Sequence, residues 1–292
     1  MKMKMKFKLK ALAVAAIMAA SVPAFAAMDD GSVSGNGELL LNVRYYGGDS
    51  ATTGGDDISA VFDLGLSMND MIAKNGQAGF SQTWDLKAGA YGASWNQLMN
   101  FPGINSNLIE FNVIALDTTD LNTPGGYRFL TTGNKDTWPS QANGITKAFE
   151  MQEKYVEANN SRGTHATDPN GASIATPTDN PDTFFGAING LGKGDTWLAN
   201  TNVDTTQTLG TEQNFWGLTT SSRSNFAQAT KTPFGVDMNN DGVIGAGEFT
   251  KVTLNDAGVL SITSPVPEAD TWAMLLAGLS MLGMMVRRRS GA

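Results

Sequence analysis

The sequence has no cysteine and only one histidine among its 292 residues. The lack of cysteine excludes disulfide bonds, thiolate zinc sites and a cysteine nucleophile, and a single histidine excludes a metal site built on a histidine pair. Charged residues are also scarce, at 16 % of the chain against about 25 % in average proteins. This composition argues against a highly charged disordered chain and against a coiled coil. It leaves a Gly/Thr/Asn-rich globular body between two distinctive ends.

The N-terminus combines alternating lysines with a short apolar stretch. Lys2 to Lys10 forms a positive region, residues 11–22 are apolar, and Ala24 and Ala26 supply the small residues of a cleavage site. This order is typical of a secretory signal peptide. The apolar stretch is shorter than the ~20 residues that a membrane-spanning helix needs. The sequence predicts a signal peptide over residues 1–26, with the Sec translocon and signal peptidase as partners and cleavage after Ala26.

The C-terminus carries a second apolar stretch, over residues 272–286, in which no residue is charged. A helix of that length covers about 22 Å at 1.5 Å per residue, less than the ~30 Å of a hydrocarbon core. The arginine cluster over residues 287–289 predicts a cytoplasmic end, which places the body on the outer side. We expect a C-terminal membrane helix. A plain anchor and a buried core helix are the alternatives, and the arginines argue against the buried helix.

The tail from residue 265 onward resembles the PEP-CTERM sorting signal of Gram-negative bacteria, which is also named for the C-terminus of ice-binding proteins. The residues that carry the resemblance are the start of a Val-Pro-Glu-Pro tetrapeptide, an interfacial tryptophan and the terminal arginines: Val266, Pro267, Glu268, Trp272, Arg287, Arg288 and Arg289. Ala269 departs from the pattern, which has a second proline there. The resemblance says nothing about what the body does, because such tails occur on unrelated bodies.

The resemblance implies recognition by an exosortase, a membrane protease or transpeptidase that removes the tail, and an association with exopolysaccharide and biofilm export. It also implies export across the inner membrane of a Gram-negative bacterium, a transient membrane anchor, and a final place at the cell surface or outside the cell. The expected organisation is a signal peptide over 1–26, a body over 27–264 and a sorting signal over 265–292.

The body between the two ends is acidic. Removing the five lysines of the signal peptide and the three tail arginines leaves 12 of the 20 cationic residues, and removing Glu268 and Asp270 leaves 26 of the 28 acidic residues. Residues 27–265 therefore carry a net charge of about −14. Such a charge disfavours nucleic acid as a partner and attracts divalent cations.

Short apolar runs separated by Gly, Asn, Asp and Thr predict a mainly β body, an antiparallel sandwich or jelly-roll-like fold. The expected strands cover residues 38–46, 58–66, 109–117, 127–131, 196–200, 214–219, 252–254 and 259–262. The strand over 127–131 is expected to pair with that over 109–117, and the last two strands form a hairpin around residues 255–258.

Two short helices are expected to interrupt the strands. Residues 94–97 fit a capping box at the start of a helix that ends near Asn100, and residues 145–159 follow a 3.6-residue apolar period. Residues 160–181 are rich in Asn, Gly, Thr and Pro, which indicates a long surface loop or a domain boundary. His165 lies in this segment and is expected to be solvated.

The sharpest motif in the body matches an EF-hand calcium loop over residues 237–248. Calcium takes six to eight oxygen ligands, and the loop offers them from Asp237, Asn239, Asp241, the Val243 carbonyl and Glu248. The flanking residues do not form helices, so we expect a structural calcium site outside a helix–loop–helix frame. An ordinary Asp-Asn-Gly turn is the alternative.

The function expected from these features is that of an exported, non-enzymatic protein of the cell surface or extracellular matrix. No residue is assigned a catalytic role, since no Gly-x-Ser-x-Gly elbow accompanies the single histidine. The alternatives are a secreted carbohydrate-active hydrolase that uses carboxylates and a calcium-stabilised carbohydrate-binding module. Ice binding is disfavoured because the threonines do not recur at a fixed spacing.

Overall fold

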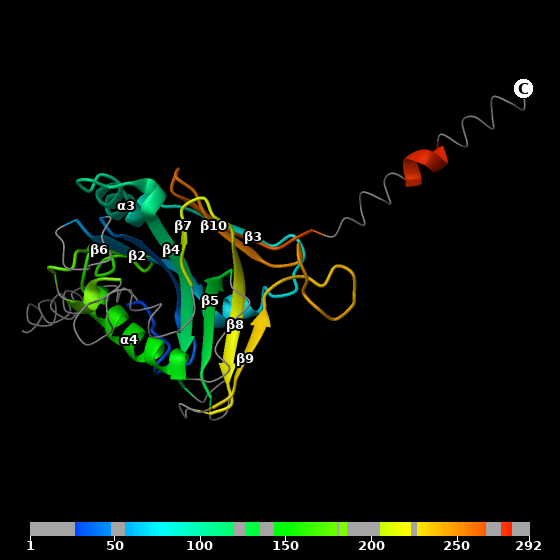
Figure 1. The fold of residues 1–292 in the computed structure, drawn as a ribbon, viewed down its shortest axis with the longest axis horizontal. Coiled ribbons are helices and arrows are strands. Elements are labelled where there is room, and N and C mark those ends of the chain that lie inside the picture. The colour runs from blue at the N-terminus through cyan, green and yellow to red at the C-terminus, as the bar shows by residue number, and fades with distance from the viewer. Residues whose placement is uncertain are drawn as a thin grey trace, which may run out of the picture.

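Antiparallel strands whose side chains alternate between two buried faces form the middle of the protein (Figure 1). The computed structural model describes residues 27–47, 56–119, 126–134, 143–179, 181–185, 205–222, 227–266 and 276–281. Its strands are β1 (Glu38–Tyr45), β2 (Ile58–Ser67), β3 (Ser81–Asp85), β4 (Ile109–Asp117), β5 (Arg128–Gly133), β6 (Ala172–Ala175), β7 (Gln207–Thr208), β8 (Gln213–Thr220), β9 (Ala229–Pro233), β10 (Lys251–Leu254) and β11 (Val259–Thr263). Its α-helices are α2 (Met68–Ile72), α3 (Gly92–Met99) and α4 (Asn143–Asn160), and its 3-10 turns are η1 (Gly89–Tyr91), η2 (Ser106–Leu108) and η3 (Pro181–Thr183).

The mainly β, antiparallel character is confirmed, but the expected sandwich of two sheets is wrong. The described strands form a single sheet in the order β3-β11-β10-β8-β5-β4-β1-β2-β6, with β7 on β4 and β9 on β8. This sheet curls into a half-barrel, so its own far strands supply the opposite wall of the core. Apolar periodicity shows that a strand face is buried, but it does not show whether the opposing wall belongs to a second sheet.

The curl brings β3, at one end of the strand order, close to β2 near the other end. The Trp84 indole on β3 donates a hydrogen bond of 3.0 Å to the Leu64 carbonyl on β2. Inside the curl, one apolar core gathers residues from β1, β2, β4, β10 and β11. Met68 of α2 and Trp95 and Leu98 of α3 belong to the same core. The sheet therefore closes on itself through side chains rather than through a continuous ladder.

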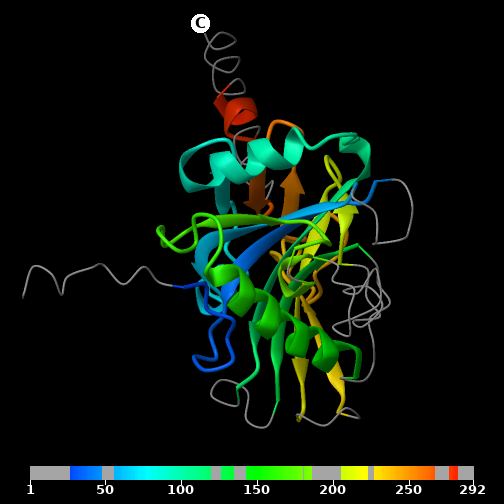
Figure 2. The same ribbon diagram turned by 90° about the vertical axis from the view of Figure 1, so that its left-hand side faces the viewer.

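Helix α4 lies across the outer face of the sheet (Figure 2). Its buried residues recur at Gln152, Tyr155, Val156 and Asn159, one side of a helix. Tyr155 and Val156 pack in a second apolar cluster with residues of β1, β2, β4 and β5. Each central strand is thus buried on both faces, which explains the nearly continuous burial along β1, β2 and β4.

Most of the predicted elements are confirmed. The structure has strands at 38–46, 58–66, 109–117, 127–131, 214–219, 252–254 and 259–262, and helices near 94–100 and 145–159, within a residue or two. The pairing of β4 with β5 and the β10–β11 hairpin are confirmed as well. The expected strand at 196–200 lies outside the described residues. Segment 160–181 includes β6, which pairs with β2 and was not predicted.

The capping-box prediction at Ser94 is wrong. Helix α3 begins at Gly92, directly after η1, so Ser94 lies inside the helix, and the N-cap residue Tyr91 makes no side-chain cap. A true capping box occurs at α2, where the Ser67 hydroxyl accepts from the Asp70 N–H and the Asp70 carboxylate accepts from the Ser67 N–H. In the predicted and in the observed capping box the two residues are three positions apart (94 and 97, 67 and 70). This spacing alone therefore does not identify the start of a helix.

The described part of the tail is short. Residues 276–281 are helical and exposed, and the rest of the predicted membrane segment lies outside the described residues. Across the described ranges we find no helix with the length and apolar character needed to cross a membrane.

Candidate functional site

The body remains folded up to the first residue of the tail. After the β11–β3 ladder ends, the Ser264 N–H donates to the Phe80 carbonyl (2.8 Å) and the Gly79 N–H donates to the Pro265 carbonyl (3.0 Å). The Ser264 hydroxyl also bonds to that of Thr250 in a buried position. The next residue, Val266, is 66 % exposed. Main-chain hydrogen bonds therefore hold the chain to the body as far as Pro265.

Among the predicted sorting residues, the structure describes only Val266. The remaining sorting and cleavage residues lie outside the described residues: Ala24, Ala26, Pro267, Glu268, Trp272, Arg287, Arg288 and Arg289.

The acidic loop over residues 237–248 folds around its own carboxylates. Asp237 accepts hydrogen bonds from the N–H groups of Gly242 (2.8 Å) and Asp241 (3.2 Å). The Asn239 side chain accepts from the Asp241 N–H at 2.9 Å, and the Asp241 carboxylate accepts from the Val243 N–H at 2.8 Å. The chain reverses through positive φ at Asn240 (58°) and Gly242 (82°). These bonds hold the side-chain oxygens against the main chain of the loop itself.

Glu248 ties the two ends of this loop together. It is only 5 % exposed, and its two carboxylate oxygens accept from the N–H groups of Met238 (3.0 Å) and Gly245 (2.8 Å). A bridge between Gly235 and Phe249 closes the base of the loop. All five predicted calcium ligands therefore lie on one closed turn. Within the described ranges, however, no three acidic or histidine side chains converge closely enough to form a ready metal cluster.

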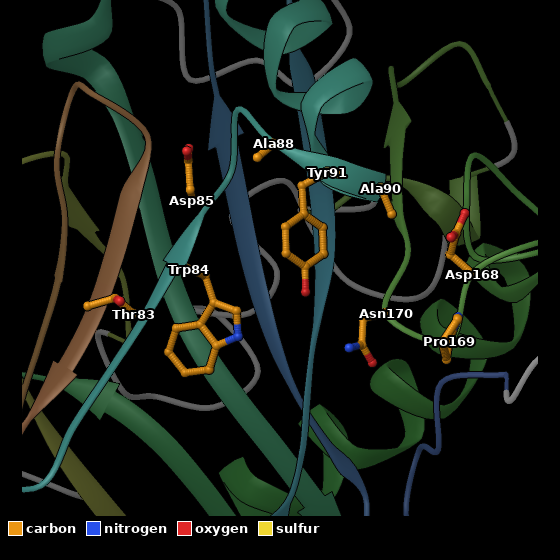
Figure 3. A pocket seen from close by; sticks show the side chains of 10 residues that line it. Thr83, Trp84, Asp85, Ala88, Ala90, Tyr91, Asp168, Pro169 and Asn170 are labelled. Atoms are coloured by element: carbon orange, nitrogen blue, oxygen red, sulfur yellow. The ribbon is translucent and has the colours of Figure 1, made fainter.

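A pocket of about 500 Å³ lies where the curled sheet meets itself (Figure 3). Its walls come from β3, from the turn through η1 and from residues 168–170, which precede β6. The Trp84 and Tyr91 rings lie side by side at its centre, and Asp168 and Asn170 lie on the other side of Tyr91. This pocket is not predictable from the sequence, because its walls are about 80 residues apart in the chain.

Two carboxylates, that of Glu38 on β1 and that of Asp63 on β2, approach each other near this pocket. Asp63 is 1 % exposed, and the Tyr91 hydroxyl donates a hydrogen bond to its main-chain carbonyl. One of its carboxylate oxygens accepts from the Gly65 N–H at 2.9 Å, and the protonated carboxyl is further favoured by a side-chain hydrogen bond to Glu38. Burial, reinforced by the charge of Glu38, raises the pKa of Asp63 to about 7. Burial likewise raises the pKa of Glu38.

His165 is not solvated, which corrects the sequence prediction. It is 3 % exposed, because its loop folds against Gly171 and β6. Burial lowers the pKa of His165 to about 4. Neither ring nitrogen of His165 has a hydrogen-bond partner among the described residues. The nearby Val61 main chain offsets part of the lowering of the His165 pKa. At neutral pH the ring is therefore uncharged and shielded from solvent.

Comparison with known proteins adds one finding, and it concerns the tail. No curated protein and no solved structure matches the chain. Residues 265–289 match the family described as the PEP-CTERM protein-sorting motif, despite Ala269. This match begins at Pro265, whose carbonyl accepts from the Gly79 N–H of the body. The chain thus ends in a PEP-CTERM sorting motif over residues 265–289, which implies an exported protein that an exosortase sorts.

Proposed function

We propose that the body is a non-enzymatic protein of the cell surface or extracellular matrix, which associates with exopolysaccharide in a biofilm. A signal peptide over residues 1–26 directs it through the Sec translocon, and signal peptidase cleaves after Ala26. The C-terminal helix holds it transiently in the inner membrane, with Arg287 to Arg289 on the cytoplasmic side. Exosortase then removes this anchor.

One observation supports this proposal: among the described residues, the main-chain bond nearest the C-terminal side of the body is the one from the Gly79 N–H to the Pro265 carbonyl. Val266 is already exposed. Cutting the chain after this point leaves the β3–β11 pair and its hydrogen bonds intact. The released product would keep the fold that the anchored protein has, as a cleavable anchor requires.

The neighbourhood of the ionisable groups supports a non-enzymatic body. A general base needs a pKa near the working pH and access to a substrate proton. His165 is buried, and its pKa of about 4 makes it a weak base at neutral pH. Asp63, on β2, has a suitable pKa of about 7, but it is only 1 % exposed, so its carboxylate is shielded from a substrate.

The sorting function is tested by comparing three forms of the protein in an exosortase-carrying cell. We expect the complete chain to reach the surface or the medium without its tail. A chain that ends at Pro265 should cross the inner membrane but stay in the periplasm, because nothing directs it further. Deleting only residues 290–292, which follow the matched motif, is the control and should leave sorting unchanged. Equal surface delivery of the form that ends at Pro265 would contradict the proposal.

We further propose that the loop over residues 237–248 holds a structural calcium ion. Asp237, Asn239, Asp241, Glu248 and the Val243 carbonyl would supply the oxygens that calcium prefers. In the structure, main-chain N–H groups occupy the carboxylates of Asp237 and Glu248, so binding would require these side chains to turn inward. The ion would then link the two ends of a loop that Glu248 already closes, and so stabilise the β8–β10 region.

Calcium is expected to raise the unfolding temperature of the protein. An ion present at 100 times its dissociation constant adds about 2.7 kcal/mol to the free energy of unfolding. Asp237→Ala should abolish this gain, whereas Asp256→Ala, at an exposed turn, should preserve it. Thermal unfolding with calcium and with a chelator measures the effect. An identical curve for the parent protein in both conditions would leave the loop as an ordinary turn.

A further inference from the structure

The pocket between β3 and residues 168–170 is separate from the tail and from the acidic loop. It lies at the seam where β3 approaches β2 without pairing with it, since β3 pairs only with β11 among the described strands. The seam is closed by two side chains, with the Trp84 indole bonded to the Leu64 carbonyl and the Tyr91 hydroxyl to the Asp63 carbonyl. A hollow remains above these two rings.

The two rings form a rigid floor for this hollow. Their polar atoms are already used in hydrogen bonds to β2, so only ring surface remains for a ligand. Trp84 and Tyr91 are each 9 % exposed and mostly packed in the core, and Figure 3 shows their rings beside each other among the lining residues. Aromatic surfaces of this kind contact the apolar faces of flat or ring-shaped ligands, and a ring fixed in advance loses little entropy on binding.

The rim of the hollow is polar and includes hydrogen-bonding groups that the protein leaves unused. The Asn170 carboxamide packs directly over Gly65, where a Cβ would lie 2.6 Å from its oxygen and nitrogen. Neither Asn170 nor Thr83 has a side-chain hydrogen bond among the described contacts, and both are exposed. Among the described residues, the Asp85 carboxylate accepts only from the Lys87 N–H and the Asp168 carboxylate only from the Thr167 hydroxyl. The Asn170 carboxamide and the Thr83 hydroxyl can both donate and accept, whereas the two carboxylates accept only.

Charge and size restrict the ligand further. The described lining contains no Lys, Arg or His, but it contains two carboxylates, so an anionic ligand is disfavoured. An isolated cation gains little from exposed carboxylates. The volume of about 500 Å³ lies within the range of small-ligand sites.

We propose that this pocket binds a short stretch of a neutral carbohydrate. One sugar ring would lie over Trp84 and Tyr91, and its hydroxyls would bond to Asn170, Asp168, Asp85 and Thr83. This inference deepens the proposed association with exopolysaccharide by naming a site and a charge class for the glycan. It does not depend on how the tail is processed.

The test uses the purified protein and defined probes in calorimetric and NMR titrations. The neutral probes are cellotetraose, maltotetraose, mannotetraose and tri-N-acetylchitotriose. Tetragalacturonic acid and choline serve as anionic and cationic probes. We expect at least one neutral probe to bind with a dissociation constant of about 1 mM, typical of a small contact. Asn170→Ala and Asp168→Ala should each weaken it about three- to tenfold, the share of one net hydrogen bond.

Two controls keep the result interpretable. Asn170 and Asp168 lie on the rim, so these variants are expected to fold, and unchanged unfolding curves would verify this. Thr230→Ala, at an exposed position of β9 away from the residues that line the pocket, should bind like the parent protein. Failure of all four neutral probes, equal binding by the rim variants, or binding of choline or tetragalacturonate alone would overturn the proposal. Release of reducing sugar from a bound probe would support the pocket but contradict the non-enzymatic function.

Discussion

Replacing Trp95 by alanine is expected to lower the free energy of unfolding by about 3–5 kcal/mol, the cost of removing a large buried ring. Trp95 on α3 is 1 % exposed, lies 6.3 Å from the Phe62 ring of β2, and belongs to the core inside the curl. Its loss would leave a cavity where α3 packs on the sheet. Urea unfolding of the variant beside the parent protein measures the effect. Leu108→Ala, at a 46 % exposed apolar residue, is the control and should cost less than about 1 kcal/mol.

A double-mutant cycle makes this prediction specific to the packing. Gly258 in the β10–β11 turn has a φ of +76°, and a Cβ there would lie 2.9 Å from the Trp95 indole nitrogen. Gly258→Ala should therefore be costly in the parent protein and cheaper once Trp95 is alanine, because part of its cost is the collision with the ring. Additive effects, or a cost below about 1 kcal/mol for Trp95→Ala alone, would contradict the packing of α3 against this turn.

The second large effect is expected from Asp63. Its pKa is about 7 in the folded protein and 3.8 ordinarily. Between pH 3.8 and pH 7, therefore, Asp63 keeps its proton in the folded state and has lost it in the unfolded state. Stability should therefore fall as pH rises from about 4 to about 7, by at most roughly 4 kcal/mol from this group. Asp63→Asn removes the titration and can still accept from the Gly65 N–H.

Measuring the free energy of unfolding from pH 4.5 to pH 8 tests this expectation. Relative to the parent protein, Asp63→Asn should gain stability steadily across the range and be the more stable form at pH 8. Asp256→Asn, at an exposed carboxyl, should follow the parent curve. His165 acts in the opposite direction, because its lowered pKa costs stability as pH falls from 6.5 to about 4. Only the difference between variant and parent therefore isolates Asp63. Parallel curves would show that Asp63 and Glu38 are not a buried pair.

The sequence predicted the central strands and α4 because their apolar residues recur over a long enough stretch. The β4 residues Ile109, Phe111, Val113 and Ala115 all face the inner core, and that period is visible without a structure. The longest helix has the same advantage, since its buried residues repeat every three or four positions.

The short edge strands could not be predicted in this way. In β3 only Trp84 is buried, and in β9 no residue is. Neither strand shows a two-residue period, because a strand at the rim packs little of its surface and pairs through main-chain atoms that carry no sequence signal. That the strands form one curled sheet instead of two sheets could not be predicted for a related reason. It depends on Trp84 reaching Leu64 across the seam, a contact between residues distant in sequence.

The candidate sites also differ in whether their residues are close together in the sequence. The sorting motif and the acidic loop are contiguous in sequence, so they were predicted from residue spacing. The pocket combines residues 83–91 with residues 168–170, and Asp63 is perturbed by Glu38 from another strand. The sequence does show a glycine at position 65 inside an otherwise apolar strand, and in the structure this residue has a positive φ of 65° and is approached closely by Asn170.

The most direct test of the whole account is the intact mass of the protein recovered from the surface or medium of a cell that carries an exosortase. We expect a species that begins at residue 27 and has lost the apolar segment and the arginines that follow the motif start at Pro265. Recovery of the exported protein with Arg287 to Arg289 still attached would contradict it.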